Sequence, residues 1–264
     1  MWNDRRSKGL EQEVIKLYKD GKTGKQISDK FGYKRRETVY QILEKHKVGR
    51  REAKRQTYYN ESFFEKINTH EKAYVLGLIM ADGWILKDYT GFGIQLTKED
   101  GYILKKISDL IGSTHELQYL NYDKVRKKLK NAKDMYRLTV YNRKIAEDLQ
   151  KLGVVKNKTK ILRYNGCVPD EHISSFLRGL MDGDGTVGFG KNGFPWCHVC
   201  STASFEFAED LVKLNPNFNI DRSTSYLWNV RVGGGKRKIL EFIKSLYKNK
   251  GDLYLRRKYE KMQN

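Results

Sequence analysis

One short pattern occurs twice in this chain and most constrains how it folds. The pattern, G-L-x-x-x-D-G, lies in residues 73–85 (AYVLGLIMADGWI) and again in residues 175–187 (SFLRGLMDGDGTV). Its two aspartates, Asp82 and Asp184, are 102 residues apart, and the first glycines of the two copies have the same spacing. Similarity at a fixed spacing indicates a repeated architecture. The sequence therefore predicts two related halves.

The segments after each copy also correspond, in the order helix, two strands, helix, two strands, helix. In the first copy the predicted elements are strands near 84–88 and 92–98, a helix over 100–112 with Ile103, Ile107, Leu110 and Ile111 inward, strands near 116–122 and 134–141, and a helix over 143–152. In the second copy they are strands near 186–190 and 196–202, a helix over 204–214 with Phe207, Leu211 and Leu214 inward, strands near 220–226 and 228–233, and a helix over 236–247. Each half closes with a basic segment, GVVKNKTK (153–160) or LYLRRKYE (253–260). We expect an α+β protein with half-domains at 63–162 and 163–264.

Residues 1–46 have a different pattern, which favours a small helix-turn-helix domain. Apolar residues recur at helical spacing in three stretches separated by glycines, with Leu10, Val14, Leu17 and Tyr18 in the first, Ile27 and Phe31 in the second, and Val39, Ile42 and Leu43 in the third. The last helix of such a unit enters the major groove of DNA. The polar residues that suit this role are Lys34, Arg35, Arg36, Thr38 and Gln41. Short three-helix units also serve as plain scaffolds, but the basic third helix favours DNA binding.

Residues 47–62 are basic and nearly free of apolar side chains, and we interpret them as a linker. Such a segment is either merely solvated or follows the phosphate backbone of DNA, as basic arms do. Composition leaves both interpretations open. Under the second, Arg50 and Arg51 are candidate DNA contacts.

The charge of the chain points to a polyanionic partner. Lys and Arg number 52 against 32 Asp and Glu, which gives a net charge of +20 spread along the whole sequence. No apolar run approaches the ~18–20 residues that span a bilayer, and no signal segment follows the first residues. We expect a soluble intracellular protein with no membrane partner, cytoplasmic in a prokaryote or phage host, or organellar.

The cysteines do not predict a disulfide framework or a zinc site. They number three, and Cys197 and Cys200 form one C-x-x-C with His198 between them. A zinc site needs four ligands, and no second pair with suitable spacing follows. We interpret these cysteines as free thiols in or beside a strand.

The repeated pattern predicts a metal site where the two halves meet. Gly77 and Gly179 fall in mid-helix, where glycine costs about 1 kcal/mol relative to alanine, so close contact between two helix backbones is the expected reason for them. Asp82 and Asp184 then come together at the helix C-termini, just before glycines apt to end a helix. A carboxylate there is repelled by the helix dipole, so a cation is needed.

Hard oxygen ligands match Mg²⁺, with Mn²⁺ as a substitute, and the carbonyls of Ala81 and Gly183 are candidate additional ligands. Mg²⁺ at this position suits phosphodiester hydrolysis, because it activates water and steadies the leaving oxygen. Lys158, Lys258 and Lys98 are candidates to stabilise the developing charge. One Asp-Gly helix end alone would favour an ordinary core helix, whereas two copies in register favour the metal site.

Residues 75–83 (VLGLIMADG) and 177–185 (LRGLMDGDG) resemble the motif of the LAGLIDADG homing endonucleases. The resemblance covers about residues 63–260. It implies two αββαββα half-domains, motif helices at their interface, and two saddle-shaped antiparallel sheets that lie along DNA in the major groove. It also implies a site-specific double-strand DNA endonuclease that acts on a long, nearly asymmetric site and leaves short 3′ overhangs.

The resemblance also implies roles for single residues. The metal ligands map to Asp82 and Asp184, with the Ala81 and Gly183 carbonyls. The basic active-site residue maps to Lys156 or Lys158 in the first half and to Arg256 or Lys258 in the second, and the local alignment leaves both choices open. The predicted DNA contacts in the sheets are Gln95, Thr97, Lys98, Thr186, Ser201, Thr202 and Arg231.

The chain departs from the family pattern at two places. Met80 stands where the motif usually has its first aspartate, which Asp182 provides in the second half. The N-terminal helix-turn-helix is an addition expected to lengthen the recognised site. We expect a monomeric, free-standing or intron-encoded enzyme. The alternatives are a maturase that binds intron RNA and a DNA-binding regulator that does not cleave.

Overall fold

The computed structural model describes residues 2–49, 58–123 and 129–263. The chain divides into two compact units, Met1–Arg55 and Gln56–Asn264, each with its own apolar core. Arg50 and Arg51, predicted DNA contacts, lie outside the described residues. No helix in the described part of the chain is long and apolar enough to cross a lipid bilayer.

The smaller unit consists of three helices, α1 (Trp2–Lys19), α2 (Gly24–Phe31) and α3 (Glu37–Lys45). They enclose the buried side chains of Val14, Ile15, Tyr18, Ile27, Val39 and Leu43. Thr23 and Gln26 form a capping box at the start of α2, and Gly32 ends that helix with a φ of 65°. Leu10, part of the predicted apolar pattern, is exposed, and the described core residues of α1 begin at Val14.

The larger unit contains the two predicted halves. The first half comprises α4 (His70–Asp82), β1 (Gly83–Ile85), β2 (Phe92–Thr97), α5 (Gly101–Ile111), β3 (Gln118–Leu120), β4 (Met135–Val140) and α7 (Arg143–Lys151). The second comprises α8 (Ile173–Asp184), β5 (Thr186–Phe189), β6 (Pro195–Thr202), α9 (Phe205–Val212), β7 (Phe218–Thr224), β8 (Leu227–Val232) and α10 (Gly235–Tyr247), followed by α11 (Arg256–Glu260). The predicted α+β class is confirmed, and each half has the expected order of elements.

Each half builds one antiparallel sheet of four strands. The strand orders are β1-β2-β4-β3 and β5-β6-β8-β7, so the two sheets have the same topology. One expectation for the helix behind the first sheet was wrong, because Leu110 is exposed. The buried stripe of α5 is instead completed by Leu104, which is adjacent to Ile103 and Ile107 on the helix surface.

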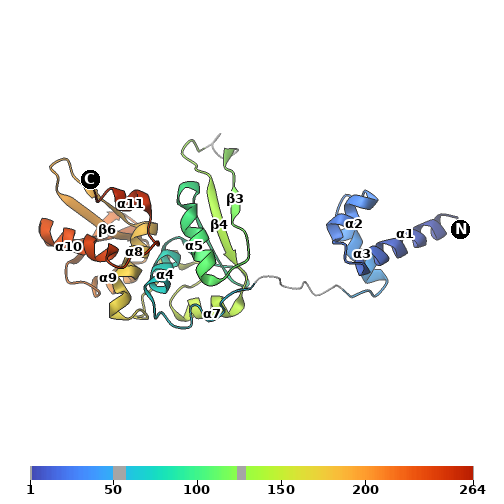
Figure 1. Cartoon of the computed structure of the whole chain (residues 1–264), viewed down its shortest axis with the longest axis horizontal. Coiled ribbons are helices and arrows are strands. Elements are labelled where there is room, and N and C mark those ends of the chain that lie inside the picture. The colour runs from blue at the N-terminus through green and yellow to red at the C-terminus, as the bar shows by residue number, and fades with distance from the viewer. Residues whose placement is uncertain (1, 50–57, 124–128, 264) are drawn as a thin grey trace. The chain divides into compact units, whose positions relative to one another are not determined.

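The motif helices α4 and α8 pack against each other where the two halves meet (Figure 1). An added Cβ at Gly77 would lie 2.2 Å from the carbonyl oxygen of Phe176, and one at Gly179 would lie 2.1 Å from that of Tyr74. No side chain fits at either position, so the expected close contact of the helix backbones is confirmed. One continuous apolar cluster includes both helices and runs through both halves.

Gly83 and Gly185 end the two motif helices, as expected, but with extended backbone, at φ −88° and −95°. Glycine is needed there for space and not for a left-handed conformation. An added Cβ at Gly83 would lie 2.8 Å from the Ile79 carbonyl oxygen, and one at Gly185 would lie 2.5 Å from that of His198. The chain therefore turns directly from each motif helix into the first strand of the sheet.

The C-x-x-C cysteines lie in β6, where Cys197 and Cys200 are buried free thiols. Burial raises the pKa of the Cys197 thiol to about 12 and that of Cys200 further. Both thiols are therefore protonated at neutral pH and act as small apolar core residues.

Candidate active site and nucleic-acid interface

The parallel packing of α4 and α8 brings Asp82 and Asp184 to the same end of the helix pair. Here Ala81 and Gly183 face each other across the seam, since an added Cβ at Gly183 would lie 2.3 Å from the Ala81 Cβ. The same added Cβ would lie 3.1 Å from Oδ2 of Asp82. The carboxylate of the first half therefore lies against the backbone of the second.

The electrostatics of the two carboxylates are unfavourable without a cation. Burial and the negative charge of Asp184 raise the pKa of Asp82 to about 6. Partial burial also raises the pKa of Asp184, although this side chain still reaches solvent. Neither carboxylate has a hydrogen-bond or ion-pair partner among the described residues. The two acids thus lie close enough to repel each other, and their oxygens are available as ligands.

Two lysines contact the C-terminal ends of the motif helices. Lys158 donates from Nζ to the Ala81 carbonyl at 2.6 Å, and burial lowers its pKa. Lys258 is 5 % exposed and donates to the carbonyls of Asp182 and Gly185, each at 2.7 Å. Burial lowers the pKa of Lys258 to about 8.

The other two basic candidates lie elsewhere. Lys156 donates to the Lys87 carbonyl at 3.2 Å, and the Arg256 guanidinium lies 4.8 Å from the ring centroid of Tyr102. The structure therefore brings Lys158 and Lys258 to the helix ends and not the alternative residues. Lys98 is exposed, with Nζ 5.6 Å from the centroid of the Tyr119 ring.

The residues at the seam fit a hard divalent cation. They supply two unpartnered carboxylates, and no group of three or more His, Cys, Asp or Glu side chains with metal-binding geometry occurs in the described ranges. The Ala81 carbonyl already accepts the Lys158 hydrogen bond, which leaves it one lone pair. Mg²⁺ suits such a sparse set, because it keeps several waters and takes phosphate oxygens as ligands.

Comparison with known families bears on the second half directly. Residues 171–249, from just before α8 through α10, match the family model described as a LAGLIDADG-like domain. The first half repeats the motif, the element order and the sheet topology of this segment. The second half of the chain is therefore a LAGLIDADG-like domain.

Solved structures of LAGLIDADG proteins are also similar to this chain. The I-LtrWI LAGLIDADG homing endonuclease bound to target DNA has 13% sequence identity and a TM-score of 0.49, over 77% of this chain and 89% of that one. The homing endonuclease I-WcaI bound to its DNA recognition sequence has 14% identity and a TM-score of 0.49, over 76% and 91% of the two chains. No curated protein matches the sequence.

The predicted DNA contacts of the first sheet share one face. Gln95 and Thr97 alternate with buried residues along β2. Gln95 accepts a hydrogen bond from Arg137 Nη2 at 2.9 Å, and the Arg137 guanidinium lies 5.5 Å from the Trp84 ring centroid. Arg137 is thus part of the same polar surface, although the sequence did not single it out. Only the strand register, which places it opposite Gln95, identifies it.

The second sheet holds its polar residues in pairs. Ser201 donates to Asn229 Oδ1 at 2.6 Å, and Arg231 forms an ion pair with Asp221 at 2.6 Å. Thr186 lies half-buried at the start of β5. Thr202, in contrast, is buried, and its hydroxyl accepts the Ser204 N–H at 3.1 Å. This burial argues against the predicted contact between Thr202 and DNA.

The predicted DNA-binding residues of the smaller unit gather near the start of α3. Lys34, Arg35 and Arg36 are exposed just before the helix, and Gln41 is exposed within it. Thr38 is half-buried. A basic, solvent-facing helix start is thus present in the three-helix unit, and its role in DNA binding remains a prediction.

Proposed function

We propose that this protein is a LAGLIDADG-type site-specific double-strand DNA endonuclease that uses a divalent metal, Mg²⁺ or Mn²⁺. It acts as a monomer on a long, nearly asymmetric site and leaves short 3′ overhangs. The observation that supports this proposal best is the meeting of two unpartnered carboxylates, Asp82 and Asp184, beside two lysine ammonium groups. A site for binding alone would not require two acids that repel each other.

Each residue at the seam has a defined part in the proposed reaction. Asp82 and Asp184 hold the divalent ion, which supplies activation of water and stabilisation of the leaving 3′ oxygen. Lys158 and Lys258 place positive charge beside the scissile phosphates, where negative charge develops. Both are fixed to helix-end carbonyls, so their ammonium groups need little reorganisation during the reaction.

The rest of the chain suits a DNA substrate. A net charge of +20 attracts the phosphate backbone. The polar face that includes Gln95, Thr97 and Arg137 on the first sheet, and Ser201 and Arg231 on the second, offers hydrogen-bonding groups to base edges. Because one chain contains both halves, one molecule can hold both strands.

The test begins with selection of cleavable duplexes from a randomised DNA library in the presence of Mg²⁺. On the selected duplex, Asp82→Asn and Asp184→Asn should each abolish cleavage while the affinity for DNA changes little, because the substitution removes a metal ligand and no interface contact. Asp109→Asn is the matched control, since the one ion pair of this exposed carboxylate in the described part of the chain is with Lys105. Wild-type cleavage rates in either seam variant would refute the assignment. Tight binding of the selected DNA without any strand scission would favour a regulator or a maturase.

A further inference from the structure

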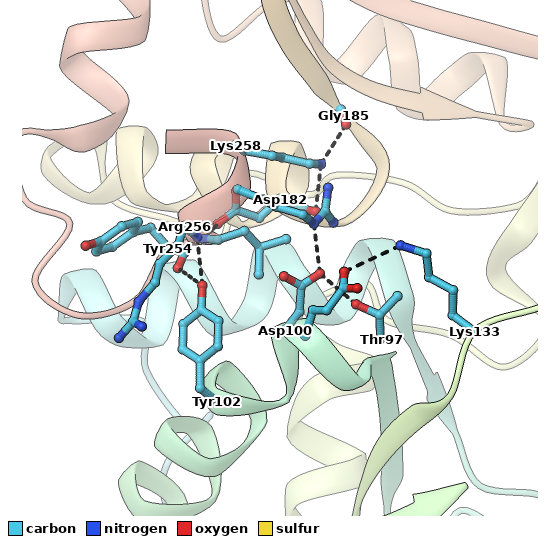
Figure 2. Close-up of polar contacts among 12 residues, drawn as sticks. Thr97, Asp100, Tyr102, Lys133, Asp182, Gly185, Tyr254, Arg256 and Lys258 are labelled. Atoms are coloured by element: carbon cyan, nitrogen blue, oxygen red, sulfur yellow. Dashed lines mark hydrogen bonds and ion pairs between the residues drawn. The ribbon is translucent and has the colours of Figure 1, made fainter. Parts of the chain in front are cut away.

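The short segment that carries Lys258 is fixed at every residue. We call Tyr254–Lys258 the Lys258 segment. Each of the four residues before the lysine makes a polar contact with the rest of the protein (Figure 2). These contacts are Tyr102 Oη to the Tyr254 carbonyl at 2.9 Å, the Leu255 N–H to Asp182 Oδ2 at 2.9 Å, the Arg256 N–H to Tyr102 Oη at 2.7 Å, and Arg257 Nε to Asp100 Oδ2 at 2.9 Å. The segment is therefore held along its whole length and not by its lysine alone.

The carboxylates that hold this segment come from both halves and are buried. Asp182, in α8, is 1 % exposed, and Asp100, at the start of α5 in the first half, is 3 % exposed. Asp182 Oδ2 also accepts a hydrogen bond from Tyr74 of α4 at 2.9 Å, whereas its Oδ1 has no hydrogen-bond partner among the described residues. Buried carboxylates are costly to keep in a fold. At these two places the hydrogen bonds to the Lys258 segment offset part of that cost.

In the corresponding segment of the first half, no buried carboxylate among the described residues holds the chain, although Lys156 donates to the Lys87 carbonyl. Met80 occupies the motif position of Asp182, and its thioether is at best a weak hydrogen-bond acceptor. Asn157 corresponds to Arg257 and has a left-handed backbone, with φ 56°. Lys158 is accordingly held by a single carbonyl, that of Ala81, and is only half-buried. The two lysines are thus held unequally in an otherwise symmetric arrangement.

Asp100 also joins the Lys258 segment to the strand that we propose faces DNA. Thr97, the last residue of β2, donates from its hydroxyl to Asp100 Oδ2 at 3.1 Å, and this is the same oxygen that accepts Arg257. If DNA binding shifts Thr97, the shift would be passed to the Asp100 carboxylate. It would therefore change the ion pair between Asp100 and Arg257. The start of α9 has Ser204 in place of this carboxylate, and its hydroxyl donates to the Leu162 carbonyl, four residues beyond Lys158. Among the described residues, no carboxylate at the start of α9 contacts the segment that carries Lys158.

We propose that Asp100 and Asp182 are positioning residues that clamp the Lys258 segment across the seam, so that cleavage of one DNA strand depends on this clamp and cleavage of the other does not. The inference rests on the proposed endonuclease function and specifies an asymmetry within it. Asp100 and Asp182 act through Lys258, and the first half supplies Asp100 to a lysine of the second half.

The first experiment compares the two strands of the selected duplex, each labelled separately. Asp100→Asn and Arg257→Gln should each slow cleavage of one strand by about tenfold or more and change the other by less than about twofold. Glu99→Gln is the matched control, because this neighbouring carboxylate is exposed and its one ion pair within the described residues is with Lys133, at 3.4 Å. Arg257→Lys should restore part of the lost rate, since it keeps a cation beside Asp100. Equal slowing of both strands, or no slowing of either, would overturn the proposal.

A second experiment measures the clamp without cleavage. Amine-labelling reagent applied to the full chain, without DNA or metal, should modify Lys258 slowly in the wild type, because its Nζ is buried and bonded to main-chain carbonyls. Asp100→Asn, Arg257→Gln and Asp182→Asn should speed labelling of Lys258 by about fivefold or more and leave Lys158 unchanged. Unchanged labelling of Lys258 in all three variants would contradict the clamp. If the wild type does not cleave DNA at all, the endonuclease proposal fails while this measurement still decides on the clamp.

Discussion

At the scale of single residues, the charged Asp82 carboxylate destabilises the folded state. Its pKa of about 6 lies above the ordinary value of 3.8, because of burial and the charge of Asp184. As pH rises through this interval, the unfolded chain releases its proton first, so the folded state binds more protons and the free energy of unfolding falls. The loss is complete only above about pH 6.

Asp82→Asn should therefore stabilise the metal-free protein. At about pH 8 in a chelator, we expect a gain of about 1–2 kcal/mol after allowance for solvent screening, and a much smaller gain at about pH 4.5. Denaturant unfolding at the two pH values measures both, with Asp109→Asn as the control. A variant less stable than the wild type at the higher pH would mean that the Asp82 charge is compensated within the protein. Gains in stability at the expense of activity are common at functional sites.

The candidate site residues that the sequence singled out are those that the duplication repeats. Asp82 and Asp184 share a motif position, and Lys158 and Lys258 share a place in the closing segments. The assignment of each residue is therefore supported by its counterpart in the other half. Arg137 was missed because its contact depends on strand register. The contact between Asp100 and Arg257 was missed for a related reason, since it joins residues of different halves and has no repeated counterpart.

At the scale of secondary-structure elements, the helix pair α4 and α8 depends on the absence of two side chains. In Gly77→Ala, the added Cβ would lie 2.2 Å from a main-chain oxygen, which cannot move without its helix. We expect the free energy of unfolding of the larger unit to fall by about 3 kcal/mol or more. Denaturant unfolding measures this change.

Gly9→Ala provides the matched control for that substitution. Gly9 is also inside a helix, α1, and nothing lies within 4 Å of an added Cβ there. Alanine should stabilise this helix by about 0.5–1 kcal/mol, because glycine is the poorer helix former. If both substitutions had the same small effect, close packing of the motif helices would not account for Gly77.

Most elements could be predicted from apolar periodicity, but their partners could not. The apolar period of 3.6 residues located α5. Of the residues predicted to point inward from this helix, only Leu110, at the edge of the buried stripe, is exposed. The strand order β1-β2-β4-β3 depends on pairings between distant residues, for which the local sequence carries no signal. Both sheets reached the same order because the two halves repeat one pattern.

At the scale of the whole molecule, duplication and asymmetry have separate roles. The repeated residues build the common core and bring the two acids together at the seam. The residues that break the repeat, Asp182 against Met80 and Arg257 against Asn157, fix one lysine more firmly than the other. A long, nearly asymmetric DNA site is what such unequal halves would require.

The three-helix unit should add affinity and site length without affecting the chemistry. Deletion of residues 1–55 removes the exposed basic residues near the start of α3 and leaves the core of the larger unit intact. If Lys34, Arg35 and Arg36 bind phosphates, the plot of log affinity against log salt should become shallower, by about 0.9 for each phosphate that these residues neutralise. Binding of the selected duplex at several salt concentrations, with footprinting, measures both effects.

The maximal cleavage rate of this deletion variant at saturating enzyme should stay within about twofold of the wild type, because Asp82 and Asp184 remain in place. An unchanged footprint and salt slope would mean that the three-helix unit is a scaffold. A unit that binds DNA through basic side chains displaces counterions from the phosphates, so its removal must reduce the salt dependence of binding.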